Sequence, residues 1–107
     1  MKLKLNFKDR LMLLSLFSTK DKAPMSDWGV IDECLALLNV SSEERDLYGV
    51  TNEEGATKWS NKEEADKETE YTIPKRGIEI AEDSLKAMNS GGGIHRDYVP
   101  IAKMLLE

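Results

Sequence analysis

The chain has 107 residues, of which 33% are charged, with a net charge of −5 at pH 7 and one cysteine, Cys34. This length fits a single domain, residues 1–107, with one modest core, and a lone cysteine excludes an internal disulfide. No apolar run approaches the roughly 18 residues of a membrane span, and no signal-peptide pattern follows the first lysines. The expected location is therefore a reducing cytoplasm.

The start of the chain carries signals for a strand and then a helix. Apolar and polar residues alternate over residues 1–5, which predicts an extended segment. Asn6 precedes Asp9 by three residues, a spacing that favours a helix N-cap at Asn6. The apolar run that follows predicts a helix over residues 7–17. It is apolar around more than half of its circumference, so we expect it to lie centrally in the core.

Two further helices are predicted before the chain changes character. Ser26 is the predicted N-cap of a helix over residues 27–38, where apolar residues recur at helical spacing. Ser41 and Glu44 have the spacing of a capping box, in which each residue satisfies a backbone N–H of the other. The short helix that they start is predicted to stop at Gly49.

The next segment predicts a β-hairpin. Residues 57–59 and 68–73 are rich in residues that favour strands, and the second segment alternates polar and apolar positions. Residues 60–67 between them are very polar, so we expect a long, acidic and mobile tip. In this pairing Trp59 and Tyr71 would lie on the same face and cover the helical core.

The C-terminal third predicts two more helices. Pro74 is placed at the start of an amphipathic helix, and the glycine run at 91–93 ends it. His95 is the predicted cap of the last helix, and Pro100 falls in its first turn, where a missing N–H costs little.

These elements predict a mainly α fold of the α+β class, with about five helices and one short hairpin. The predicted core gathers the apolar residues that recur at helical spacing. They are Leu11, Leu14, Trp28, Leu35, Leu38, Ile78, Ala81, Leu85 and Leu105.

Residues with the chemistry of catalysis or metal binding are scarce. Cys34 and His95 are the only cysteine and histidine, too few for a structural zinc site. The glycine run at 91–93 lacks the Gly-Lys-Ser/Thr ending of a phosphate loop. The carboxylates lack the order of a calcium loop and sit in polar segments that would not raise their pKa for acid catalysis. We therefore predict no catalytic residue, metal or cofactor, and a protein that is not an enzyme.

The charge is unevenly distributed along the chain. Residues 1–22 carry a charge of +4, residues 23–51 carry −5, residues 52–71 carry −4, and the remainder is neutral. The acidic middle would repel a nucleic-acid backbone, although acidity also serves solubility alone. An acidic surface of this kind can dock on a basic protein surface. The residues predicted to do so are Glu53, Glu54, Glu63, Glu64 and Asp66.

A DNA-binding alternative remains open. Three helices followed by a hairpin at 57–73 match the order of the winged-helix fold, whose third helix enters the major groove. Here that helix, at 41–48, would present a net negative face around Glu43 and Glu44. The only patch that would attract phosphates is basic and N-terminal: Lys2, Lys4, Lys8 and Arg10.

Several short motifs resemble a family of small, poorly characterised proteins encoded by bacteriophages and prophages. Residues 7–14 resemble its F-x-x-R-L-x-L-L opening. Further segments follow in the family's order: S-x-E-E at 41–44, G-x-x-x-W at 55–59, a second strand at 67–73 and a terminal helix from Ile94 to 103–106. The glycines at 91–93 and Pro100 depart from the pattern. The resemblance implies a bacterial host cytoplasm as the setting, but no activity and no functional residue.

The leading hypothesis is a non-enzymatic phage or prophage accessory protein, monomeric or homodimeric, that binds a host or phage protein with a basic surface. An inhibitor of a host protein, such as a defence nuclease, belongs to this class. Neither nucleic acid nor a membrane is expected as a partner. The alternative is a transcriptional regulator with a winged-helix-like domain.

Overall fold

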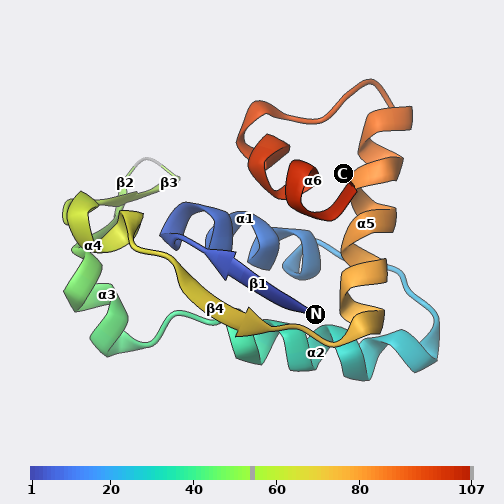
Figure 1. Ribbon diagram of the computed structural model, residues 1–107, viewed down its shortest axis with the longest axis horizontal. Helices are drawn as coiled ribbons and strands as arrows, with labels where there is room; N and C mark the ends of the chain where they lie inside the picture. Colours follow the sequence, from blue (N-terminus) through green and yellow to red (C-terminus); the bar gives the residue numbers. More distant parts are fainter. Residues whose placement is uncertain (54, 107) are drawn as a thin grey trace.

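A computed structural model describes residues 1–53 and 55–106 of the chain. The described residues form six helices, one 3₁₀ turn and two two-stranded antiparallel sheets. Figure 1 shows how they are arranged. In chain order they are β1 (Lys2–Leu5), α1 (Phe7–Ser18), α2 (Met25–Leu38), α3 (Ser42–Tyr48), β2 (Val50–Glu53), β3 (Ala56–Trp59), α4 (Lys62–Asp66), β4 (Thr69–Thr72), α5 (Lys75–Ser90), η1 (Arg96–Tyr98) and α6 (Val99–Leu106). The mainly α, α+β class predicted from the sequence is confirmed.

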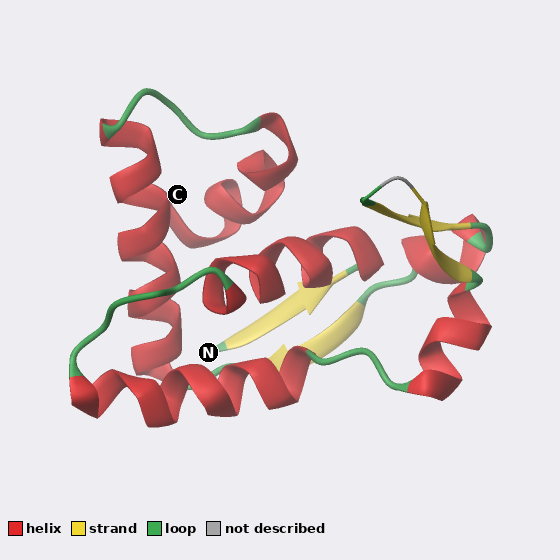
Figure 2. Cartoon of the chain, turned by 180° about the vertical axis from the view of Figure 1, so that it is seen from behind, coloured by secondary structure: helices red, strands yellow, loops and turns green. Residues whose placement is uncertain are grey.

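Helix α1 lies in the middle of the molecule and contacts α2, α4, α5, α6 and η1. The long helix α5 stands at one end, while α3, the β2–β3 hairpin and α4 form the other end (Figure 1). Figure 2 shows this separation from behind, with the hairpin at the end opposite to α5. We call α3, β2, β3 and α4, residues 42–66, the end lobe. No helix among the described residues is long and apolar enough to cross a membrane.

Local capping explains where the first and third helices begin and end. The Asn6 side chain accepts a hydrogen bond from the Asp9 backbone N–H at 2.9 Å, as predicted. Ser41 and Glu44 form the complete capping box at the start of α3. Gly49 ends α3 with φ +65°, in the left-handed region that residues with a Cβ avoid.

The predicted N-cap of the second helix was wrong. Helix α2 begins at Met25, and Pro24, not Ser26, occupies the cap position. The carbonyl of Pro24 accepts a hydrogen bond from the Asp27 N–H at 2.9 Å, so Ser26 already lies in the first turn. Proline fixes its own φ near the value that a helix entry needs, which explains the earlier start.

The predicted hairpin was also wrong in its pairing. Strand β3 pairs with β2, so that Trp59 lies opposite Val50, whereas β4 pairs with β1, so that Tyr71 lies opposite Leu3. Trp59 and Tyr71 therefore belong to different sheets. The segment between β3 and β4 is no hairpin tip, because it forms α4 and buries Ala65. Strand β4 pairs with β1 rather than with β3, and β1 directs its alternate leucines into the core.

The core confirms the predicted residues of α2, α5 and α6 at Leu38, Ile78, Ala81, Leu85 and Leu105, all buried. Four residues of the predicted core are less buried than expected, because Leu11 and Leu14 of α1 and Trp28 and Leu35 of α2 are only partly buried. Of these, Leu14, Trp28 and Leu35 pack against the core. The buried apolar residues of α1 are Phe7, Leu13, Leu16 and Phe17. The first turn of this inward face also carries Asp9 and Arg10.

Candidate functional site

The end lobe collects exposed carboxylates from neighbouring helices. Glu43 and Asp46 are exposed on α3, and Glu63 and Asp66 are exposed on α4, which packs against α3. Glu68 is also exposed, just after the lobe. Acids that are separated in sequence therefore share one end of the molecule.

The structure divides the predicted docking residues into two kinds. Glu53 pairs with Lys58 across the hairpin at 3.6 Å, and half-buried Glu64 pairs with Lys67 at 2.8 Å. Among the described residues, Glu63 and Asp66 have no cationic partner within 4.0 Å. Glu54 lies outside the described residues. Of the predicted docking residues that the structure describes, Glu63 and Asp66 are thus the two that are exposed and outside an ion pair.

An aromatic cluster attaches the end lobe to α1. Phe7, the first residue of α1, stacks on Tyr48 with 4.3 Å between ring centroids. The Trp59 ring meets Phe7 edge-on at 5.1 Å. Tyr48 ends α3 and Trp59 ends β3, so one buried ring holds two elements of the lobe in place. Aromatic pairs of this geometry contribute about 0.5–1.5 kcal/mol each beyond the area that they bury.

Arg10 makes the second attachment. Its side chain is only 4% exposed and its guanidinium donates to both carboxylate oxygens of Glu44. It also donates to the carbonyls of Leu38 at 2.9 Å and Asn39 at 2.6 Å. These carbonyls end α2 and would otherwise lack partners. Hydrogen bonds from Arg10 lower the pKa of Glu44 to about 2. Arg10 therefore ties α1 to the end of α2 and to the start of α3.

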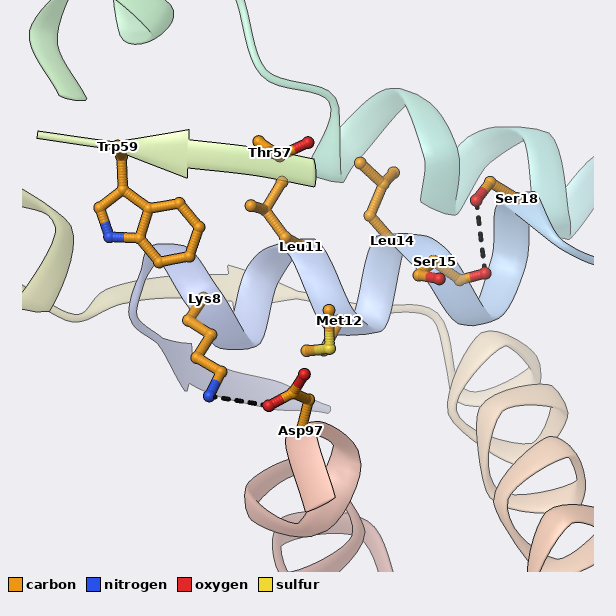
Figure 3. Close-up of a pocket in the computed structure, with 9 residues that line it drawn as sticks. All are labelled: Lys8, Leu11, Met12, Leu14, Ser15, Ser18, Thr57, Trp59 and Asp97. Carbon is orange, nitrogen blue, oxygen red and sulfur yellow. Dashed lines mark hydrogen bonds and ion pairs between the residues drawn. The ribbon is translucent and has the colours of Figure 1, made fainter. Parts of the chain in front are cut away.

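An apolar groove separates the hairpin from α1 (Figure 3). It has a volume of about 390 Å³ and its lining comes from three elements: Lys8, Leu11, Met12, Leu14, Ser15 and Ser18 of α1, Thr57 and Trp59 of β3, and Asp97 of η1. Leu11 and Leu14 point toward the strand that carries Thr57 and Trp59, whereas Met12 lies on the side of Asp97. The ammonium of Lys8 pairs with Asp97 at 3.2 Å at the rim.

A second, more open hollow adjoins Trp59. It has a volume of about 340 Å³ and is lined by Thr57, Lys58, Trp59 and Lys62. Thr57 and Trp59 line both hollows, so they form the wall between an apolar floor and a pair of lysines.

The single cysteine and histidine occupy different environments. Cys34 is fully buried in α2, and burial raises the pKa of its thiol to about 11. His95 is exposed and caps η1, where its ring nitrogen accepts from the Asp97 N–H at 3.1 Å. The predicted capping role of His95 is thus confirmed, although it caps the 3₁₀ turn that leads into α6.

Sequence reasoning missed two features of these surfaces. It placed Arg10 in an exposed basic patch, but the structure buries Arg10 and pairs Lys2 with Glu70 and Lys8 with Asp97. It also assigned Leu11 and Leu14 to the core. The signal that could have found the groove was the surplus of leucines on α1, which has more apolar faces than one core contact needs.

Comparisons with known protein families, curated protein sequences and solved structures give no match to this chain.

Proposed function

We propose that this chain is a non-enzymatic binding protein whose end lobe docks on a basic surface of another protein. The observation that carries the proposal is the gathering of exposed acids on adjoining helices α3 and α4. By sequence, residues 42–66 hold eight acidic residues against Arg45, Lys58 and Lys62. Complementary charge accelerates association and excludes partners of the wrong sign.

The way in which the lobe is held supports this role. Phe7 packs between Tyr48 and Trp59, and Arg10 fixes Glu44 at the start of α3. The exposed acids Glu43 and Asp46 therefore stand on a short helix, α3, that these contacts hold in place. Helix α4, which carries Glu63 and Asp66, packs against α3 and α1. A surface that is ordered before binding loses less conformational entropy on binding than a flexible one.

The proposed setting is the cytoplasm of a bacterium that carries a phage or prophage. Its support is the resemblance of the motifs at 7–14, 41–44 and 55–59 to small phage-encoded proteins. Inhibition of a host protein that normally binds nucleic acid is one form of the proposed function, since an acidic surface can occupy a site made for phosphates.

A DNA-binding regulator has less support. The helix that would enter the major groove, α3, exposes Glu43 and Asp46. Neutralisation of phosphates supplies most non-specific DNA affinity, and this face has the wrong sign for it.

The decisive experiment compares two charge-reversed variants in affinity purification from a bacterial lysate. Glu63→Lys with Asp66→Lys reverses the lobe, while Asp32→Lys with Asp83→Lys reverses two exposed acids outside it. We expect the wild type and the control to retain the same basic protein, and the lobe variant to lose it. Retention by the lobe variant, or a shift of duplex DNA by the wild type at physiological salt, would contradict the proposal.

A further inference from the structure

We infer that the groove between α1 and β3 is a second docking site, which takes an acidic segment of a protein partner carrying a bulky apolar side chain. This site uses β3 and Lys62 of the end lobe but not the exposed acids of α3 and α4, and it does not depend on the function proposed for those acids.

The floor of the groove is apolar and only partly covered by the rest of the protein. Leu11 and Leu14 are only partly buried although they lie on the central helix of the molecule, and Met12 lines the groove on the side of Asp97. A volume of about 390 Å³ exceeds the space that a large apolar side chain needs. Inserting such a side chain would remove the remaining exposed surface of these residues from water, which favours binding in proportion to the apolar area buried.

One wall of the groove is anchored through Trp59. Trp59 is fixed by its edge-on contact with Phe7 at 5.1 Å, and Phe7 is itself stacked on Tyr48. Aromatic residues held in this way are frequent anchors of protein interfaces, because they offer a large contact area without further loss of conformational freedom.

The charges next to this wall specify the occupant. Lys8 stands on the α1 side of the groove, and Lys58 and Lys62 line the hollow that adjoins Trp59. Lys8 is held by Asp97, whereas the pair of Lys58 with Glu53 is long, at 3.6 Å, and exposed on both sides. A chain that crosses Trp59 would therefore place an apolar side chain on Leu11 and Leu14 and a carboxylate near Lys58 and Lys62.

An acidic peptide fits this arrangement better than a single-stranded nucleic acid. A tryptophan among lysines can stack on bases. Nucleic-acid binding, however, needs a cationic track along the backbone, and exposed Glu63 and Asp66 on α4 would interrupt it beside Lys62. A short peptide places its charge at one point and avoids them.

Selection from a displayed library of random 12-residue peptides tests the inference. We expect the immobilised protein to enrich peptides in which Asp or Glu flanks Trp, Phe or Leu. The enriched peptide should bind Lys58→Glu/Lys62→Glu about tenfold more weakly than the wild type. The matched control, Lys86→Glu/Lys103→Glu, reverses two exposed lysines on α5 and α6 and should bind the peptide as the wild type does.

A second readout places the peptide in the groove. In a Trp28→Phe background the remaining tryptophan is Trp59, so its fluorescence should change on titration with the peptide. Leu14→Ala should weaken binding while leaving the fold intact, since Leu14 is only partly buried. The inference is overturned if no peptide or only basic peptides are enriched, if the lysine reversal binds unchanged, or if a single-stranded oligonucleotide binds more tightly than the peptide.

Discussion

The carboxylate of Glu44 serves Arg10 and Ser41 at once. Its oxygens accept from the buried guanidinium of Arg10, and Oε1 also accepts from the Ser41 N–H at 3.2 Å to complete the capping box. Glu44, in the first turn of α3, therefore both caps this helix and fixes it to α1. A capping box on a surface helix acts locally, but this one couples the end lobe to the core.

Because of this coupling, the free energy of unfolding should fall as the pH is lowered. The pKa of Glu44 is lowered from 4.5 to about 2, first by the hydrogen bonds from Arg10. A carboxyl with a depressed pKa in the folded state stabilises the protein fully above its unfolded pKa, near 4.5, and loses that contribution as the pH falls towards 2. Urea unfolding of the wild type and of Glu44→Gln should therefore differ clearly at pH 6 and progressively less below pH 4.5.

Glu43→Gln is the matched control for this experiment, because Glu43 is exposed on the same turn of α3. Its difference from the wild type should be small at every pH. A constant difference between Glu44→Gln and the wild type from pH 6 to pH 3 would mean that Glu44 does not carry the acid dependence.

Arg10→Met should lower the free energy of unfolding by about 3 kcal/mol, because it leaves Glu44 and two carbonyls at the end of α2 without their hydrogen-bond donor.

The orientation of α1 is testable by truncating adjacent leucines. Leu13 is fully buried, whereas its neighbour Leu14 is partly exposed in the groove. Leu13→Ala should lower the free energy of unfolding by about 2–5 kcal/mol, and Leu85→Ala by a similar amount, because each leaves a cavity. Leu14→Ala should cost about 1 kcal/mol, as solvent can enter the vacated space. Equal losses at Leu13 and Leu14 in denaturant unfolding would contradict this orientation.

The elements that depend on local signals were predictable from the sequence. The caps at Asn6, Ser41 and His95 and the stop at Gly49 involve residues within a few positions of one another. Helix α5 was equally clear, because its apolar residues keep to one face.

Features set by distant partners were not predictable. The pairing of β4 with β1 joins residues that are 64 to 70 positions apart, whereas sequence patterns favour pairing with the nearest strand. Likewise, nothing near Arg10 in the sequence indicates that its side chain donates hydrogen bonds to the carbonyls of Leu38 and Asn39. Because Arg10 was expected to be exposed, Leu11 and Leu14 were assigned to the core, and the groove that they line was not predicted. The acids of the end lobe were found because charge is visible in sequence, but their ion pairs were not.

Helices α2 and α5 approach closely at Gly77 and Cys34. A Cβ on Gly77 would lie 2.6 Å from the Cys34 sulfur and 3.3 Å from Cγ2 of Ile73. Gly77→Ala should therefore cost about 1–3 kcal/mol of stability through overpacking. In a Cys34→Ala background the same substitution should cost less, because the sulfur is gone. Additive losses in this double-mutant cycle would show that the two residues do not press on each other.

Burial should also make Cys34 inert. Its pKa is raised to about 11 by loss of solvent around the thiolate, so very little reactive thiolate exists at pH 8. Ellman's reagent should label the native protein no faster than the rate at which it opens, and should label it at once in 6 M guanidinium. Rapid native labelling at pH 8 would show that the contact between α2 and α5 is open in solution.

The path of the chain from α3 into the β2–β3 hairpin depends on Gly49. This residue has φ +65°, and a Cβ there would collide with the hydroxyl of Ser60, whose N–H donates to the Gly49 carbonyl. Gly49→Ala should cost about 1–2 kcal/mol for the left-handed backbone, with a further loss from the collision. Gly55 is the matched control, since its φ is +78° but no atom lies within 4 Å of the position of a Cβ. Gly55→Ala should therefore lose only the stability that the left-handed backbone costs. Adding Ser60→Gly to Gly49→Ala should restore part of the additional loss at Gly49. Thermal unfolding of the wild type, Gly49→Ala, Gly55→Ala and Gly49→Ala/Ser60→Gly measures these differences. If Gly49→Ala and Gly55→Ala were equally destabilised, the Ser60 side chain would have turned away from the added methyl without cost, and the expected collision would be wrong.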